Sequence, residues 1–163
     1  MALKLNGDGT ETGAVFNRPA FLVYRTTMQV LSNETHTVPT FDLEEIDTDN
    51  CYNLTTQKFT PNVSGTYFFY ANATMASASR PNLEDSIVRI LKNGTTVLAE
   101  AEIDPGDENG KMGAASNQVM IMTAMNGTTD FVQMTAYIKK QTSNAELEGG
   151  GGRVYFGGFR LLA

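Results

Sequence analysis

Short stretches of hydrophobic and β-branched residues alternate along the chain with clusters of Gly, Pro, Asn and Asp. These strand-like stretches recur about every 8 to 12 residues between Phe21 and Leu162, and no apolar pattern with a helical period reaches a useful length. Short strands separated by turns at this spacing are typical of sandwiches and jelly rolls. The pattern therefore predicts an all-β, antiparallel domain of one of these two kinds.

Three of the predicted strands are hydrophobic on both faces. Four aromatic residues follow one another in Tyr67–Tyr70, and residues 119–125 and 155–162 carry large apolar side chains at odd and even positions alike. Alternate residues of a strand face opposite sides, so a two-layer domain covers only one of these faces by itself. We expect the other face to be buried between the subunits of a closed, symmetric assembly. The residues expected at this interface are Tyr67, Phe68, Phe69, Tyr70, Met120, Met122, Tyr155, Phe156 and Phe159.

The strongest turn signal is Asn93-Gly94, which separates residues 86–92 from residues 95–103. Both central residues of a type I′ turn need positive φ, which Asn and Gly adopt readily, so these two stretches are predicted to form a hairpin.

Residues 1–19 are small and polar, and we interpret them as an arm ahead of a domain that spans residues 20–163. The arm is either a frayed terminus or an attachment segment that becomes ordered against a partner.

Composition and charge narrow the function classes. The chain has 163 residues, the size of one domain, and its net charge of −6 argues against binding nucleic acid through the phosphates. No apolar run approaches the ~18 residues of a membrane span, and residues 1–7 hold no run long enough for a secretory signal. Cys51 is the single cysteine, so no internal disulfide forms, and we expect it to be a small buried hydrophobic residue.

No group of residues indicates catalysis. His36 is the only histidine and lies in a polar stretch, so we expect a surface histidine and a protein that is not an enzyme. The glycines 149–152 lack the Lys-Ser/Thr pair and the helix of a phosphate-binding loop, and no cofactor is expected. Asp104, Asp107 and Glu108 offer oxygen ligands for Ca²⁺, but their spacing is not that of an EF-hand. A solvated acidic loop is the other interpretation.

Several motifs together resemble one family. Tyr52-Asn53 is followed by Thr56 and by Phe59-Thr60, then by V-x-G-x-Y-F-F from Val63, and the chain closes on F-x-G-F-x-L from Phe156. Over roughly residues 20 to 163, this combination resembles the globular head domain of complement component one q (C-one-q), which shares its trimeric jelly roll with tumour necrosis factor. One departure is that the family's Thr-Gly turn reads Thr56-Gln57 here.

The resemblance implies a non-enzymatic jelly roll that forms a homotrimer, and some members bind Ca²⁺ near the trimer apex. The short arm, residues 1–19, resembles those of fibre and tip proteins of tailed bacteriophages. We therefore expect a virion fibre, tail-tip or decoration protein that binds other virion proteins through the arm. Its loops at 76–82, 104–117 and 139–153 would contact a glycan or protein of the host surface. The alternative is a secreted ligand or pattern-recognition module that binds a protein or glycan in the extracellular space.

Overall fold

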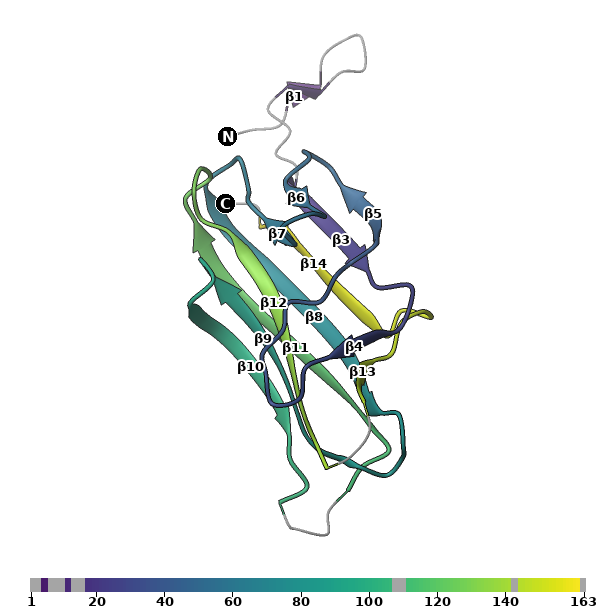
Figure 1. Ribbon diagram of the computed structural model, residues 1–163. Coiled ribbons are helices and arrows are strands. Elements are labelled where there is room, and N and C mark those ends of the chain that lie inside the picture. Colours follow the sequence, from purple (N-terminus) through teal and green to yellow (C-terminus); the bar gives the residue numbers. More distant parts are fainter. Residues whose placement is uncertain (1–3, 6–10, 13–16, 107–110, 142–143, 162–163) are drawn as a thin grey trace.

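The computed structural model describes residues 4–5, 11–12, 17–106, 111–141 and 144–161, and all the regular structure in them is β-strand. One sheet contains β3 (Ala20–Tyr24), β4 (Gln29–Leu31), β5 (Leu43–Asp47), β8 (Gly65–Ser77), β11 (Ala114–Met125), β13 (Ala145–Leu147) and β14 (Val154–Arg160). The second contains β6 (Tyr52–Asn53), β7 (Lys58–Phe59), β9 (Leu83–Lys92), β10 (Thr96–Ile103) and β12 (Val132–Lys140). Every pairing is antiparallel, and the two sheets form the layers of a sandwich in Figure 1.

The seven-stranded sheet is built around β8. One edge of β8 pairs with β11 from Gly65 to Ala76 without a break in register. The other edge pairs first with β14 and then with β13. Beyond these, β3 and β5 extend the sheet past β14, and β4 extends it past β13. The sheet therefore places β11 at one edge and β5 at the opposite edge.

The inward faces of the two sheets meet in an aromatic core. Phe21 stacks on Phe59 with ring centroids 4.3 Å apart, and the edge of Phe156 meets Phe21 at 4.9 Å. Tyr67 and Phe69 lie parallel along β8, 5.9 Å apart. Such pairs contribute about 0.5–1.5 kcal/mol beyond the area that they bury. The core thus joins β3, β7, β8 and β14, and it decides which side chains of these strands point outward.

The hairpin predicted at Asn93-Gly94 is confirmed. Asn93 and Gly94 have φ angles of 54° and 75°, and β9 and β10 pair on either side of them. The Asn93 side chain accepts a hydrogen bond from the Phe131 amide (3.0 Å) and donates one to Asp130 Oδ1 (3.0 Å). The hairpin is therefore tied to the turn that joins β11 to β12.

Two local expectations differ from the structure. The loop expected over residues 104–117 ends where β11 begins, at Ala114. The loop expected over residues 139–153 contains β13, whose Ala145 and Leu147 are fully buried. A strand of three residues is too short to show an alternating pattern, so the sequence did not reveal it.

The predicted arm, residues 1–19, lies largely outside the described residues. Its described parts are β1 (Lys4–Leu5), which pairs with β2 (Glu11–Thr12), and residues 17–19. Arg18 forms an ion pair with Asp49 (2.7 Å), and the Pro19 carbonyl accepts a hydrogen bond from the Arg160 amide (3.2 Å). The last two residues of the predicted arm thus contact the sandwich. None of the described residues belongs to a helix that is long and apolar enough to cross a membrane.

Candidate functional site

The outward side of the seven-stranded sheet carries a continuous hydrophobic surface. Met122, Phe68 and Phe159 are neighbours across β11, β8 and β14. Met120 and Tyr70 are paired in the adjacent row. We call this surface the aromatic–methionine face; it consists of Leu22, Tyr24, Leu43, Ile46, Phe68, Tyr70, Met120, Met122, Tyr155 and Phe159.

Several side chains of the aromatic–methionine face are open to solvent. Met120 and Met122 on β11 are 59% and 61% exposed, and Leu43 and Ile46 on β5 are 42% and 43% exposed. Fully burying one large apolar side chain yields about 1.5–3 kcal/mol. Monomeric soluble proteins rarely expose a large contiguous apolar patch, and such patches mark interaction sites. The face is therefore the first candidate for the functional surface.

Three of the nine residues expected at an interface lie elsewhere. Tyr67, Phe69 and Phe156 are fully buried between the two sheets, so they do not reach a neighbouring molecule, and the expectation is corrected for them. Four successive aromatic residues do not reveal which of them point inward. The other six expected residues lie on the aromatic–methionine face, namely Phe68, Tyr70, Met120, Met122, Tyr155 and Phe159.

The other four residues of the face were missed in the sequence. Leu22 and Tyr24 alternate with the buried Phe21 and Val23, which makes β3 a fourth strand with two hydrophobic faces. This alternation was the signal that could have identified them. Leu43 and Ile46 lie on β5 and are separated by two glutamates. This spacing does not follow the alternation of a strand, so it does not predict that both side chains lie on the same side of the sheet.

Two consecutive glycines of β14 shape the face. An added Cβ at Gly157 would lie 2.6 Å from Cζ and Oη of Tyr70 on the outward side. An added Cβ at Gly158 would meet the ring of Phe69 and lie 2.9 Å from the Phe68 carbonyl oxygen. The glycine pair therefore lets one aromatic ring of β8 lie flat against β14 on each side of the sheet.

Three tyrosines cluster on the face: Tyr24 and Tyr155 are paired in one row, and Tyr70 lies in the adjacent row. The Tyr155 ring lies 6.1 Å from that of Tyr24 and 6.2 Å from that of Tyr70. Gln118 Nε2 is 3.2 Å from the Tyr155 hydroxyl and donates to it. Burial raises the pKa of Tyr70, and the neighbouring Tyr24 and Tyr155 raise it further. The Tyr70 phenol therefore stays neutral at physiological pH, and the three tyrosine hydroxyls add hydrogen-bonding groups to an otherwise apolar surface.

A groove lies beside Tyr24, between β3, β5 and the glycine-rich loop before β14. Its volume is about 300 Å³, and Tyr24, Arg25, Thr26, Leu43 and Gly150–Gly152 line it. The loop is fixed by a hydrogen bond from the Gly150 amide to the Arg25 carbonyl (3.1 Å). The glycine run that the sequence predicted to be a loop thus forms one wall of a concave site.

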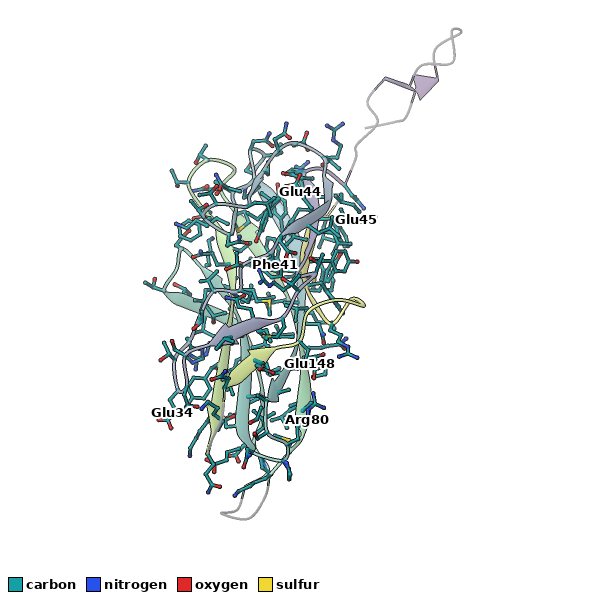
Figure 2. The ribbon with its side chains drawn as sticks, turned by 45° about the vertical axis from the view of Figure 1, so that its right-hand side comes forward. Glu34, Phe41, Glu44, Glu45, Arg80 and Glu148 are labelled. Carbon is teal, nitrogen blue, oxygen red and sulfur yellow. The ribbon has the colours of Figure 1, made fainter. Side chains whose placement is uncertain are left out.

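The loops at the end of the sandwich away from Pro19 form a second, polar surface. The amide of Gln141 donates to the Asn82 carbonyl (3.2 Å), and that of Ala78 donates to the Asn144 carbonyl (3.1 Å). Arg80 and Arg153 both bind the carboxylate of Glu148; Figure 2 labels Arg80 and Glu148 close together in the lower part of the molecule. Met112, in the loop at 104–117, forms a bridge with Leu83, so parts of all three loops expected to contact a host are gathered at one end of the sandwich (Figure 1).

The candidate chemical groups do not assemble into a reactive site among the described residues. The His36 side chain is largely exposed, and its ring lies 5.0 Å from that of Tyr137. Desolvation of the partly covered ring lowers the pKa of His36, and the charge of Arg89 lowers it further. Cys51 is 8% exposed, and burial raises the pKa of its thiol. Neither residue belongs to a set of groups placed for nucleophilic or acid–base chemistry.

The calcium interpretation rests on a loop of which only part is described. Asp104 is exposed, and its carboxylate accepts a hydrogen bond from the Gly106 amide (2.8 Å). Asp107 and Glu108 lie outside the described residues. Within the described part of the chain, no three His, Cys, Asp or Glu residues are grouped so that they could hold a metal ion.

The comparisons with known proteins agree with this architecture. A sequence profile for the family described as "C1q domain" matches residues 20–161. A search of curated protein sequences gave no significant match.

Among solved structures, the chain is similar to the globular domain of the zebrafish complement 1qA protein, with 18% sequence identity and a TM-score of 0.62 over 89% of this chain and 98% of that one. It is also similar to the Eiger TNF from S. frugiperda, with 9% sequence identity and a TM-score of 0.63 over 89% of this chain and 94% of that one. A third similar structure is murine APRIL, with 10% identity and a TM-score of 0.59 over 87% of this chain and 98% of that one. At these identities the similarity shows the fold, and it confirms the predicted jelly roll.

Proposed function

The chain belongs to the C1q domain family, and on this basis we propose that it is a non-enzymatic binding module that forms a homotrimer through its aromatic–methionine face. C1q and TNF homologues form homotrimers and bind ligands, and domains of this kind are binding modules rather than enzymes. In the proposed trimer, the face is buried between protomers and the polar loops remain free for a ligand.

The observation that carries the proposal is the hydrophobic edge of the sheet at β11. This strand pairs with β8 over its twelve residues without a bulge, and within the described part of the chain no strand pairs with its other edge. It contains neither lysine nor proline, which commonly protect exposed edge strands. Together with the exposed Met120 and Met122, this edge requires a cover, and another copy of the chain would supply one.

The test is the native mass of the protein with and without residues 1–19. A trimer for both forms is the expected result, because the face lies entirely within residues 20–161. A trimer that requires residues 1–19 would mean that the face alone does not hold the assembly. A monomer at micromolar concentration in both forms would contradict the proposal.

We further propose that the trimer serves as a fibre, tail-tip or decoration protein of a bacteriophage particle, attached to other virion proteins through residues 1–19. The small, polar composition of this segment supports the proposal. Detection of the chain by mass spectrometry in purified, protease-washed particles is the expected result. Its absence from particles, with recovery from the extracellular fluid, would instead support a secreted ligand or pattern-recognition module.

The gathered loops around Arg80 and Glu148 are the proposed contact with a glycan or protein. Glu148 is held by two arginines, so it fixes the position of Arg80 while half of the Arg80 side chain stays exposed (52%). A glycan array probed with the trimer is the direct test. If this surface binds, Arg80→Ala should reduce binding without changing the native mass, whereas an unchanged signal would exclude this surface.

A further inference from the structure

We propose that Met120 of one protomer occupies the groove between β3, β5 and the loop 150–152 of the next protomer. The inference rests on the proposed trimer and goes beyond it, because it names the residue of a second copy of the chain that fills this groove.

The groove is suited to an apolar side chain. Arg25 is its only charged lining residue, and each guanidinium nitrogen already binds a carbonyl: Nη1 that of Thr40 (2.6 Å), Nε that of Thr27 (2.9 Å) and Nη2 that of Met28 (3.4 Å). The Arg25 side chain is only 14% exposed, so little of it is open to solvent. Gly151 and Gly152 have no atom within 4 Å of where a Cβ would lie, so this wall is open.

Methionine also has the chemistry to fill this groove. Its side chain is unbranched and flexible and adapts to irregular spaces, and its sulfur makes favourable contacts with aromatic rings at about 5 Å. Tyr24 supplies such a ring, and Leu43 supplies an aliphatic wall. Met120 is 59% exposed in the single chain, so its burial in the groove adds a hydrophobic gain that the isolated protomer lacks.

The positions of the two features fit a closed ring. A cyclic assembly uses an interface in which two different patches of the same chain meet. Here the protruding methionines lie on β11, at one edge of the seven-stranded sheet, and the groove lies against β3 and β5 at the opposite edge. Each protomer therefore offers a convex patch to one neighbour and a concave patch to the other.

The strand register brings the two patches to similar heights. Met120 shares its row with Leu22 and Ile46, and the Tyr24–Leu43 pair lies one row, or two residues, further along the strands. A threefold rotation preserves height along its axis, so strands inclined to the axis meet those of the neighbour with an offset. An offset of one row places Met120 at the groove and Met122 beside Leu22 and Ile46 of the neighbour.

The test is a photo-crosslink from position 120. The full chain is prepared with a diazirine-bearing aliphatic amino acid in place of Met120, its native mass is measured, and it is irradiated and digested with trypsin. Cross-linked dimers are expected to join position 120 to peptides 5–25, 26–58 or 141–153 of a second chain, which contain Tyr24, Leu43 and the glycine loop. The control carries the same amino acid in place of Val97, which is 47% exposed on β10 in the other sheet, and should give no cross-linked dimer.

The outcomes separate the two proposals. A trimer whose cross-links from position 120 run to peptide 112–139 of the neighbour would show methionines meeting each other, which overturns the groove but keeps the trimer. A monomer without cross-links overturns both. Leu43→Trp, which fills the groove within its own chain, provides a second test: the dissociation constant of the trimer should rise about tenfold or more. An unchanged constant would also overturn the groove as the site of contact.

Discussion

Gln57 occupies the position at which the family's Thr-Gly turn has its glycine. Its φ of 57° lies in the left-handed region, which disfavours residues with a Cβ. The side chain is 7% exposed, and its amide oxygen accepts hydrogen bonds from Phe41 N (3.1 Å) and Tyr52 Oη (3.0 Å). Its amide nitrogen donates to the carbonyls of Phe41 (3.2 Å) and Leu54 (2.5 Å). The four hydrogen bonds explain how a residue larger than glycine is accepted in this turn.

Replacement of Gln57 should separate these two effects. Gln57→Ala is expected to lower the free energy of unfolding by about 2–4 kcal/mol, because buried partners lose their hydrogen bonds while the left-handed backbone remains. Gln57→Gly loses the same bonds but relieves the backbone, so its cost should be about 1 kcal/mol smaller. Urea unfolding of both variants measures the difference. Equal losses would mean that the backbone conformation contributes nothing at this position.

The two glycines of β14 should also respond differently to substitution. Gly158→Ala places a methyl group against Phe69 and the β8 backbone in the core, so we expect a loss of about 1–3 kcal/mol in the free energy of unfolding. Gly157→Ala displaces the ring of Tyr70 on the outward side. It should change unfolding of the monomer less and weaken assembly more. Unfolding curves and sedimentation of both variants test this; the reverse order of effects would contradict the assignment of the two faces.

At the scale of elements, the sequence predicted the strands with strong alternation and the Asn93-Gly94 hairpin. It did not predict the extent of β8, which continues through Ala71, Ala73 and Met75, each at most 1% exposed. Alanine has little preference for strands, and these positions are strand because the strands on both sides supply hydrogen-bond partners. Tertiary context of this kind is not encoded in a local window of sequence.

The turn between β11 and β12 offers a matched test of steric fit. Gly127 and Gly151 both have positive φ, at 73° and 58°. A Cβ at Gly127 would meet the backbone of Val63 and Ser64, whereas one at Gly151 has no neighbour within 4 Å. Gly151→Ala should cost about 1–2 kcal/mol for its conformation alone. Gly127→Ala should lower the free energy of unfolding by more than Gly151→Ala does, and thermal or urea unfolding measures both losses. Equal losses would mean that the loop at residues 63–64 moves aside freely.

The ion pair that joins two turns should give a pH dependence. Lys92 Nζ lies 2.8 Å from Asp130 Oδ2, and this contact, together with the Asn93 amide, holds the pKa of Asp130 below its ordinary value of about 3.9. The stabilisation is therefore complete above the ordinary pKa and is lost as the pH falls through the lower pKa of the folded state. The difference in unfolding free energy between the wild type and Asp130→Asn should shrink from pH 5 to pH 2. A constant difference would show that the charge of Asp130 has no role.

At the scale of the whole molecule, strands with two hydrophobic faces were sufficient to predict an outward hydrophobic surface. They were not sufficient to assign Tyr67 and Phe69 to the core, because the inward direction of a strand depends on the sheet opposite it. The groove beside Tyr24 could not be predicted either, since its walls come from three segments that are distant in sequence. Only the fold brings residues 24–26, 43 and 150–152 together.

Charge placed on the aromatic–methionine face should block assembly while leaving the fold intact. Met122→Lys introduces an ammonium group at a side chain that is 61% exposed in the single chain, so the protomer tolerates it. Its burial between protomers would be unfavourable, and the dissociation constant of the trimer should rise about a hundredfold or more. Val97→Lys, on the other sheet, is the matched control. If both variants keep the native mass of the wild type, the face is not the interface.

Because the start of β3 and the gathered loops lie at opposite ends of the sandwich, a trimer with its axis along the strands would be polar (Figure 1). Three attachment segments would leave from one end, and three copies of the loop surface would face the same way at the other. A ligand held weakly by one loop surface would then be held by three at once. Linked sites of this kind can strengthen binding about 10²- to 10⁴-fold without any new contact, provided that the spacing of the ligands matches that of the sites. The target best suited to such a molecule is a densely repeated one, such as a glycan-covered surface, rather than a single soluble receptor.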